Sequence, residues 1–235
     1  MSDTPYQDLL AAYSQPGCPI CRLENKAIDY YLQTALREKL NDQTIRQEIK
    51  DSFGFCREHT WRMRSLGSGK TMAATLGYHD TLLAAVQALQ HADLTPPRIR
   101  KSWFQKKRPD APIVRFDRVV QALTPAKRCP ACRIAEGFSR STLSMLVKFL
   151  TDPQLSGVMA GSDGLCLPHL RTAFELVQDE EACRRLISTS MERYEAVRRE
   201  LLDVFRQFEQ RKITKTTEKE DETWVKVINA VSGQR

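Results

Sequence analysis

A C-x-x-C pair followed by a C-x-x-H pair occurs twice in this chain of 235 residues. The pairs are separated from their second copies by 111 and 110 residues, respectively. The first copy consists of Cys18, Cys21, Cys56 and His59, and the second of Cys129, Cys132, Cys166 and His169. Two side chains three residues apart can bind one ion, and two such pairs complete a tetrahedron of three thiolates and one imidazole. The duplication predicts two zinc ions per chain, one bound by each copy, with an iron–sulfur cluster as the alternative.

The residues around both motifs are patterned as helices. Apolar residues follow each C-x-x-C pair at helical spacing, and Asp42 and Asp152 are suited to start a second, shorter helix in each copy. No segment shows the alternation of a convincing β-strand. The fold predicted is therefore all-α, with two pseudo-repeated helical units, each stapled by a Cys3His metal site. The main expected helices cover residues 23–36, 71–91, 134–150 and 180–211.

The repeat also suggests a division of the chain. We expect a first helical repeat over residues 1–93 and a second over 113–212, separated by a basic, proline-rich linker at 94–112. A polar tail at 213–235 ends in a short helix around Trp224. Each repeat has limited core to bury, and structural zinc supplies about 10–16 kcal/mol of apparent binding free energy at neutral pH. The metal is thus expected to decide whether each half folds.

Positive charge is concentrated between the two copies of the motif. Residues 94–128 contain ten Lys or Arg residues against Asp110 and Asp117, whereas the whole chain carries a formal charge of +7. Basic residues with interleaved aromatics suit a phosphate backbone with bases to stack on, but a solvated linker explains the same pattern. The candidate nucleic-acid contacts are Arg98, Arg100, Lys101, Trp103, Lys106, Lys107 and Arg108.

The remaining composition excludes several classes of protein. No apolar run approaches the eighteen or so residues that a membrane span needs, so no membrane partner is expected. The N-terminus has neither the basic start nor the apolar core of a secretory signal. Cysteines in such a chain are better interpreted as thiols or metal ligands than as disulfides, and a cytoplasmic location is expected.

The motifs resemble those of a known family. The chain resembles an uncharacterised prokaryotic family, a domain of unknown function, whose members carry duplicated CPxC…GFCxxH units. The resemblance rests on Cys18-Pro-Ile-Cys21 and Gly54-Phe-Cys-Arg-Glu-His59, and on the second copies of these motifs at Cys129 and Cys166. The resemblance covers roughly residues 8–210 and implies a metal-binding helical fold, without a known reaction. The second copy differs from the first, since Ala135 stands where the first has Glu24.

Three functions compete at this point. The sequence favours a non-catalytic zinc scaffold or adaptor that binds a macromolecular partner, either a protein or a nucleic acid. The alternative is a thiol-redox or iron–sulfur electron-transfer protein that uses the duplicated Cys3His sites. A zinc hydrolase is the least favoured, because four protein ligands leave no coordination position for water.

Overall fold

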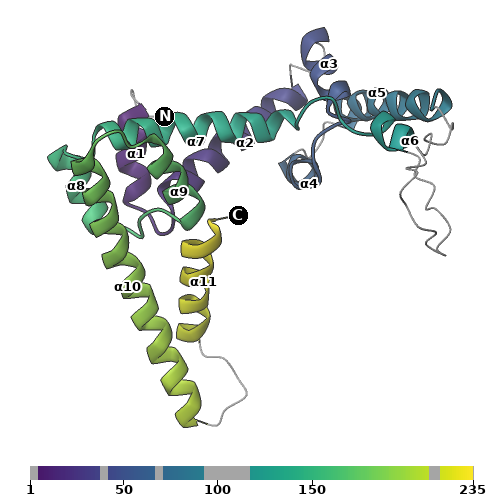
Figure 1. Cartoon of the computed structure of the whole chain (residues 1–235). Coiled ribbons are helices and arrows are strands. Elements are labelled where there is room, and N and C mark those ends of the chain that lie inside the picture. Colours follow the sequence, from purple (N-terminus) through teal and green to yellow (C-terminus); the bar gives the residue numbers. More distant parts are fainter. Residues whose placement is uncertain (1–4, 38–41, 67–70, 93–116, 212–217, 235) are drawn as a thin grey trace, which may run out of the picture. The chain divides into compact units, whose positions relative to one another are not determined.

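The computed structural model describes residues 5–37, 42–66, 71–92, 117–211 and 218–234. Every regular element in these ranges is a helix, which confirms the prediction of an all-α fold (Figure 1). The chain forms two compact units, and they do not coincide with the two repeats of the sequence. Unit 1 comprises Met1–Tyr30 and Ile134–Arg235, and unit 2 comprises Tyr31–Arg133. The boundaries fall inside helices α2 (Pro19–Arg37) and α7 (Pro130–Lys148), so each unit takes residues from both copies of the motif.

Unit 1 contains the larger core. Beside its parts of α2 and α7 it consists of α1 (Pro5–Tyr13), α8 (Pro153–Ala160), α9 (Leu167–Leu176), α10 (Glu180–Arg211) and α11 (Glu218–Ser232). Helix α1 was not expected from the sequence, yet its Leu9 is completely buried. Side chains from α1, α2 and α7–α10 form one apolar cluster. Its fully buried members include Leu9, Ile20, Leu143, Leu146, Leu155 and Leu186.

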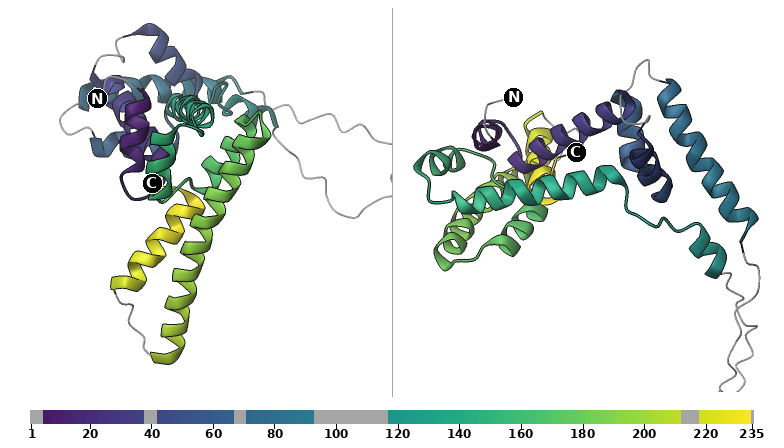
Figure 2. Two further views of the ribbon diagram at one scale, coloured as in Figure 1. Left: turned by 90° about the vertical axis from the view of Figure 1, so that its left-hand side faces the viewer. Right: turned by 90° about the horizontal axis from the view of Figure 1, so that it is seen from above.

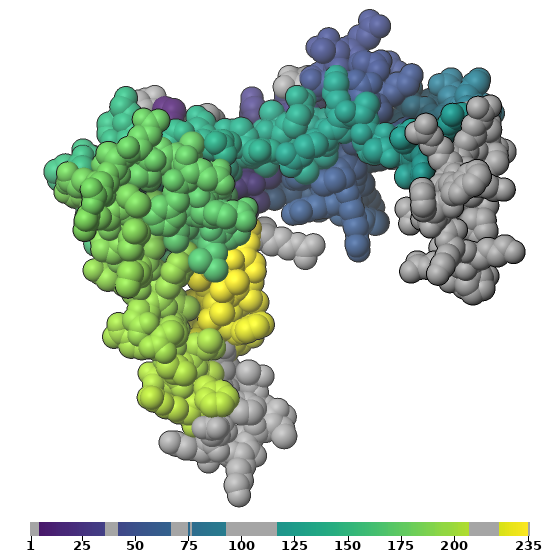
Figure 3. Space-filling model, viewed as in Figure 1, coloured from purple at the N-terminus to yellow at the C-terminus, as the bar shows by residue number. Residues whose placement is uncertain are grey.

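The C-terminal helix packs against unit 1. Helix α11 lies along α10 and contacts α9, as the views of Figures 2 and 3 show. Thr223 is buried, and Lys226 Nζ lies 2.8 Å from a carboxylate oxygen of Glu200. The short helix expected around Trp224 is therefore part of a longer, 15-residue helix. Its packing brings the following residue, Gly233, to the start of α2.

Unit 2 has the smaller core. It contains the end of α2, the start of α7, and helices α3 (Gln43–Asp51), α4 (Arg57–Leu66), α5 (Thr71–Gln90) and α6 (Asp117–Ala122). Helix α5 leaves large apolar side chains exposed, among them Leu82 and Leu89. The predicted linker at 94–112 lies outside the described residues. The buried apolar residues described in this unit include Tyr31, Leu32, Ala35, Ile49, Met63, Cys129, Pro130 and Ala131.

Aspartate caps start the short helix of each sequence copy, as expected. The Asp42 side chain accepts hydrogen bonds from the backbone of Thr44 and Ile45 at the start of α3. Asp152 does the same for the backbone of Gln154 and Leu155 at the start of α8. These caps satisfy backbone donors that the first turn of a helix leaves free.

Candidate metal centres

The eight predicted ligands gather into two clusters of three cysteines and one histidine. The first cluster consists of Cys18, Cys21, Cys166 and His169, all in unit 1. The second cluster consists of Cys56, His59, Cys129 and Cys132, all in unit 2. Within each cluster the ligand atoms lie within 4.8 Å of one another.

The predicted pairing of the motifs is wrong. The sequence placed each C-x-x-C pair with the C-x-x-H pair that follows it, but each cluster combines the C-x-x-C pair of one copy with the C-x-x-H pair of the other. The reason is the length of α2, which begins beside Cys18 and runs for 19 residues. The ring of Phe55 packs against Tyr31, with 6.4 Å between the ring centroids. Tyr31 lies about 15 Å along the helix from Cys21, so the adjacent Cys56 is too far away to share an ion with Cys21.

Each ligand pair occupies the start of a helix. Cys18 and Cys129 immediately precede α2 and α7, and Cys56 and Cys166 immediately precede α4 and α9. The second member of each pair follows three residues later, in the first helical turn. The N-terminal end of a helix carries a partial positive charge, which favours thiolate over thiol. Four helix starts thus supply all eight candidate ligands.

A glycine two residues before the C-x-x-H pair sets the direction of the chain. Gly54 and Gly164 have φ angles of +89° and +70°, in the left-handed region that residues with a side chain rarely adopt. The chain turns there and presents Cys56 and Cys166 directly before a new helix. The Gly-x-Cys pattern in the sequence therefore reports a turn that positions a thiol.

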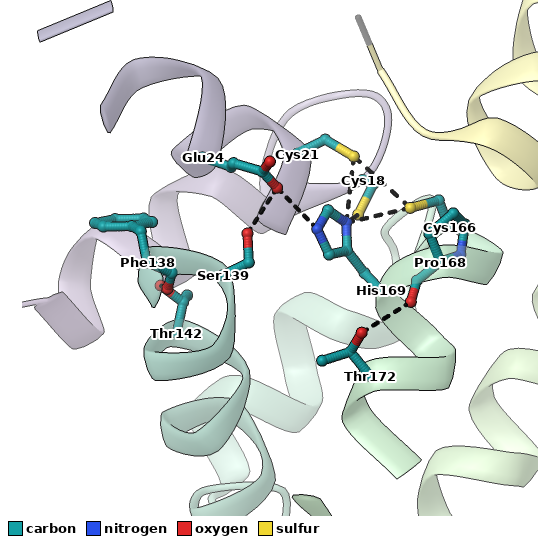
Figure 4. A network of polar contacts seen from close by, with 10 residues as sticks. All are labelled: Cys18, Cys21, Glu24, Phe138, Ser139, Thr142, Cys166, Pro168, His169 and Thr172. Carbon is teal, nitrogen blue, oxygen red and sulfur yellow. Dashed lines mark hydrogen bonds and ion pairs between the residues drawn. The ribbon is translucent and has the colours of Figure 1, made fainter. Parts of the chain in front are cut away.

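The distances in the first cluster match the edges of a tetrahedron around one ion. The Nδ1 atom of His169 lies 3.5, 3.3 and 3.2 Å from the Sγ atoms of Cys18, Cys21 and Cys166, respectively. The Sγ atoms of Cys21 and Cys166 are 3.7 Å apart. Tetrahedral zinc with usual bond lengths requires about 3.8 Å between two sulfurs and about 3.5 Å between sulfur and nitrogen. Figure 4 shows the three sulfurs turned toward this nitrogen.

The second cluster has closely similar dimensions. The Nδ1 atom of His59 lies 3.2, 3.7 and 3.4 Å from the Sγ atoms of Cys56, Cys129 and Cys132, respectively. The Sγ atoms of Cys56 and Cys132 are 3.7 Å apart. Both clusters therefore offer the same four atoms in the same geometry, and both use the Nδ1 atom of their histidine.

A carboxylate orients the histidine of the first cluster. His169 Nε2 lies 2.9 Å from Glu24 Oε2, and the same oxygen accepts a 2.6 Å hydrogen bond from the Ser139 hydroxyl (Figure 4). A carboxylate on the second ring nitrogen fixes the tautomer and raises the basicity of a metal-binding histidine. Glu24 lies one helical turn after Cys21, and the corresponding position after Cys132 is Ala135. The three-residue spacing between Cys21 and Glu24 could have indicated this role of Glu24, whereas no pattern in the sequence indicated Ser139.

In the absence of a metal ion, the side chains of the first cluster shift one another's pKa values. Burial alone would raise the pKa of Cys18 and lower that of His169. Hydrogen bonds within the cluster outweigh it, so that the Cys18 pKa falls well below its usual value and the His169 pKa rises to about 11. The pKa of Cys21 is raised, chiefly by its hydrogen bond to Cys166. In the second cluster, burial and the electrostatic interaction with Cys129 raise the pKa of Cys132 to about 12. The first cluster thus contains a thiolate–imidazolium pair of Cys18 and His169, and a bound metal ion would displace the imidazolium proton.

The two clusters differ in their access to solvent. The three cysteines of the first cluster are all buried, with exposed fractions of 2, 6 and 1% for Cys18, Cys21 and Cys166. In the second cluster Cys56 and Cys132 are partly exposed, while His59 and Cys129 are buried. The chemistry of the ligands is the same, but their surroundings are not.

The candidate nucleic-acid contacts from Arg98 to Arg108 lie outside the described residues. Further along the basic segment, Lys127 Nζ forms a 3.0 Å ion pair with Asp51. This lysine is therefore paired with a carboxylate of the same unit.

Comparisons with known proteins give a family but no reaction. An uncharacterised 23.9 kDa protein encoded in the xynA 3′ region of Caldicellulosiruptor sp. (strain Rt8B.4) is 24% identical over 181 residues, covering 77% of this chain and 76% of that protein. No solved structure matches the chain. Among the described residues, no helix is both long enough and apolar enough to cross a membrane. The model of a family of unknown function, DUF6062, matches residues 3–233, and the chain belongs to this family.

Proposed function

We propose that this protein is a non-catalytic, zinc-binding helical scaffold that binds a macromolecular partner. The observation that carries the proposal is the closed geometry of the two clusters. Each brings four protein atoms to the corners of a tetrahedron sized for one ion. A catalytic zinc keeps a position for water or substrate, and four protein ligands leave none.

The spacing of the ligands favours a single ion over an iron–sulfur cluster. A cluster with several irons distributes its cysteine ligands over different metal atoms and needs a wider cage. Here two sulfurs lie 3.7 Å apart in each set, and all four ligand atoms lie within 4.8 Å of one another. Three thiolates and an imidazole at these distances suit tetrahedral zinc.

An exposed apolar face on helix α11 supports the role of a scaffold. Helix α11 keeps Trp224, Val225, Ile228 and Val231 on its surface, with 57% of Trp224 exposed. These positions follow the i, i+1, i+4, i+7 spacing of one helix face, which suits contact with another protein. A nucleic acid is the second candidate partner, because of the excess of basic residues and the aromatics in residues 94–128.

Native mass spectrometry of the full-length protein, combined with absorption spectroscopy, tests the metal assignment. We expect two zinc ions per chain and no absorption band in the visible range. A coloured protein with the mass of iron and inorganic sulfide would favour the electron-transfer alternative. A chain that binds no metal after refolding with zinc would refute the proposal.

A further inference from the structure

The C-terminal segment covers the first cluster. A Cβ atom placed on Gly233 would lie 2.9 Å from Cys21 Sγ and 3.3 Å from Cys166 Sγ. The Gln234 side chain donates a 3.1 Å hydrogen bond to the carbonyl of Pro16, immediately before the Gly17–Cys18 turn. Gly233 has a φ of +84°, so a residue with a side chain would be both strained and in collision with the sulfur. The backbone at Gly233 thus lies over two of the three sulfur atoms.

The matching pair of cysteines in the second cluster is less buried among the described residues. Cys56 and Cys132 are separated by the same 3.7 Å as Cys21 and Cys166. Both are partly exposed, whereas Cys21 and Cys166 are buried. Because oxidation of cysteine follows thiolate character and access, two sites with equal ligands should differ in reactivity when only one is covered.

We propose that the second cluster is a reaction site for hydroperoxides, and that Cys56 and Cys132 form a disulfide there and release the metal. The proposal rests on the metal binding proposed above. The first cluster remains loaded under the same conditions because Gly233 shields it. Unit 2 would then respond to oxidant while unit 1 remains folded.

The reaction balances with the peroxide as the two-electron oxidant. The Cys56 thiolate attacks the terminal oxygen, the O–O bond breaks, and the departing alkoxide or hydroxide takes a proton from solvent. This leaves a sulfenic acid on Cys56. The Cys132 thiolate then attacks that sulfur, and hydroxide leaves and is protonated to water. The two sulfurs must approach from 3.7 Å to about 2.05 Å. Only Cys129 and His59 then remain as ligands, too few to retain zinc.

The test starts from the full-length protein loaded with two zinc ions, whose metal content is confirmed first by native mass spectrometry. Limited hydrogen peroxide is added, and released zinc is followed with a colorimetric chelator. We expect one ion per chain to leave first, and peptide mapping to find a disulfide between Cys56 and Cys132. Loss of both ions together, loss from the first cluster first, or a first disulfide elsewhere would overturn the proposal. A protein that never contained two ions would instead contradict the metal assignment.

Two glycine variants test the shielding. Gly233→Val should displace the C-terminal segment, so that peroxide releases both ions in one phase. Gly157→Val is the matched control, because a Cβ atom at this position in α8 would meet no atom within 4 Å. The control should retain the order of release. If Gly233→Val also retained that order, Gly233 would not be the shield.

Discussion

Unit 1 and unit 2 each assemble a set of three cysteines and one histidine, but they support these ligands differently. In unit 1 the cluster is covered by Gly233, its histidine is held by Glu24, and its cysteines are part of an apolar core that reaches from α1 to α10. In unit 2 two of the cysteines, Cys56 and Cys132, are partly exposed. The comparison teaches that the same ligand set can be buried to different degrees and supported by different neighbouring side chains.

The largest expected effect is on the folding of the two units when a ligand is removed, because their cores differ in size. Among its described residues unit 2 has few buried apolar side chains, and two of the ligands, His59 and Cys129, are themselves buried. Structural zinc supplies about 10–16 kcal/mol, which exceeds the net stability of about 5–15 kcal/mol of a typical domain. Cys129→Ser should therefore unfold unit 2, while Cys166→Ser should loosen unit 1 and leave part of its core protected.

Hydrogen exchange followed by mass spectrometry can separate these outcomes, since it reports on each helix. In the Cys129→Ser protein we expect loss of protection in α3 and α4 and retention in α8 and α10. Cys183→Ser is the control, because this cysteine on α10 belongs to neither cluster. Equal loss of protection in both units would mean that they do not fold as separate units.

The next largest effect is expected on the zinc affinity of the first cluster when the carboxylate of Glu24 is removed. Substituting a group that orients a metal-binding histidine typically costs 10–100-fold in metal affinity or activity, so Glu24→Gln should weaken zinc binding at the first cluster by about that factor. Competition with a chelator of known affinity measures the change. Glu136→Gln, one residue after Ala135 on α7, is the control for loss of a carboxylate near a cluster. Equal affinities of the two variants at the first cluster would show that Glu24 does not act through His169.

The metal-free first cluster should make the stability of unit 1 depend on pH in two directions. Between about pH 6.5 and 9, folded and unfolded chains bind equal numbers of protons at Cys18 and His169, because the folded pair is ionised and the unfolded pair is neutral. Below pH 6.5 the unfolded histidine takes up a proton, so stability falls as the pH falls. Above pH 9 the unfolded thiol loses its proton while His169 retains its own up to about pH 11, so stability falls as the pH rises.

Urea unfolding of the metal-free protein at pH 5, 7.5 and 10 tests this profile, with unit 1 followed by hydrogen exchange. The zinc-loaded protein should lack the fall on the alkaline side, because zinc requires unprotonated ligands. A stability of the metal-free unit 1 that rises steadily from pH 7.5 to 10 would exclude the ion pair.

The smallest expected effect concerns the binding of nucleic acid by residues 94–128. If residues 94–128 bind nucleic acid, affinity should fall with salt, with each phosphate contact adding about 0.9 to the log–log slope on duplex DNA or about 0.7 on single strands. Replacing Lys106, Lys107 and Arg108 by Gln should flatten the slope, and replacing Trp103 should weaken binding to single strands through lost stacking. Fluorescence anisotropy at two salt concentrations measures both. Absence of binding at low salt would leave a protein as the partner.

Local features of the fold could be predicted from the sequence because they depend on neighbouring residues. The caps at Asp42 and Asp152 and the helices that follow Cys21 and Cys132 are of this kind. The eight candidate ligands were also recognisable, since a pair three residues apart is a local pattern. Their pairing could not be found in this way. It depends on how far α2 carries the chain before Phe55 packs against Tyr31, which is a tertiary contact. The position of Gly233 beside Cys21 joins residues more than two hundred positions apart and left no local signal.

The most direct test of the crossed pairing is the zinc content of two double variants. Cys21→Ser with Cys166→Ser removes two ligands from one cluster, whereas Cys21→Ser with Cys56→Ser removes one ligand from each. Native mass spectrometry should find one zinc ion in the first variant, and a weakly held ion or none in the second. The reverse result, with one ion retained when Cys21 and Cys56 are changed together, would show that each sequence copy binds its own metal and would contradict the crossed clusters.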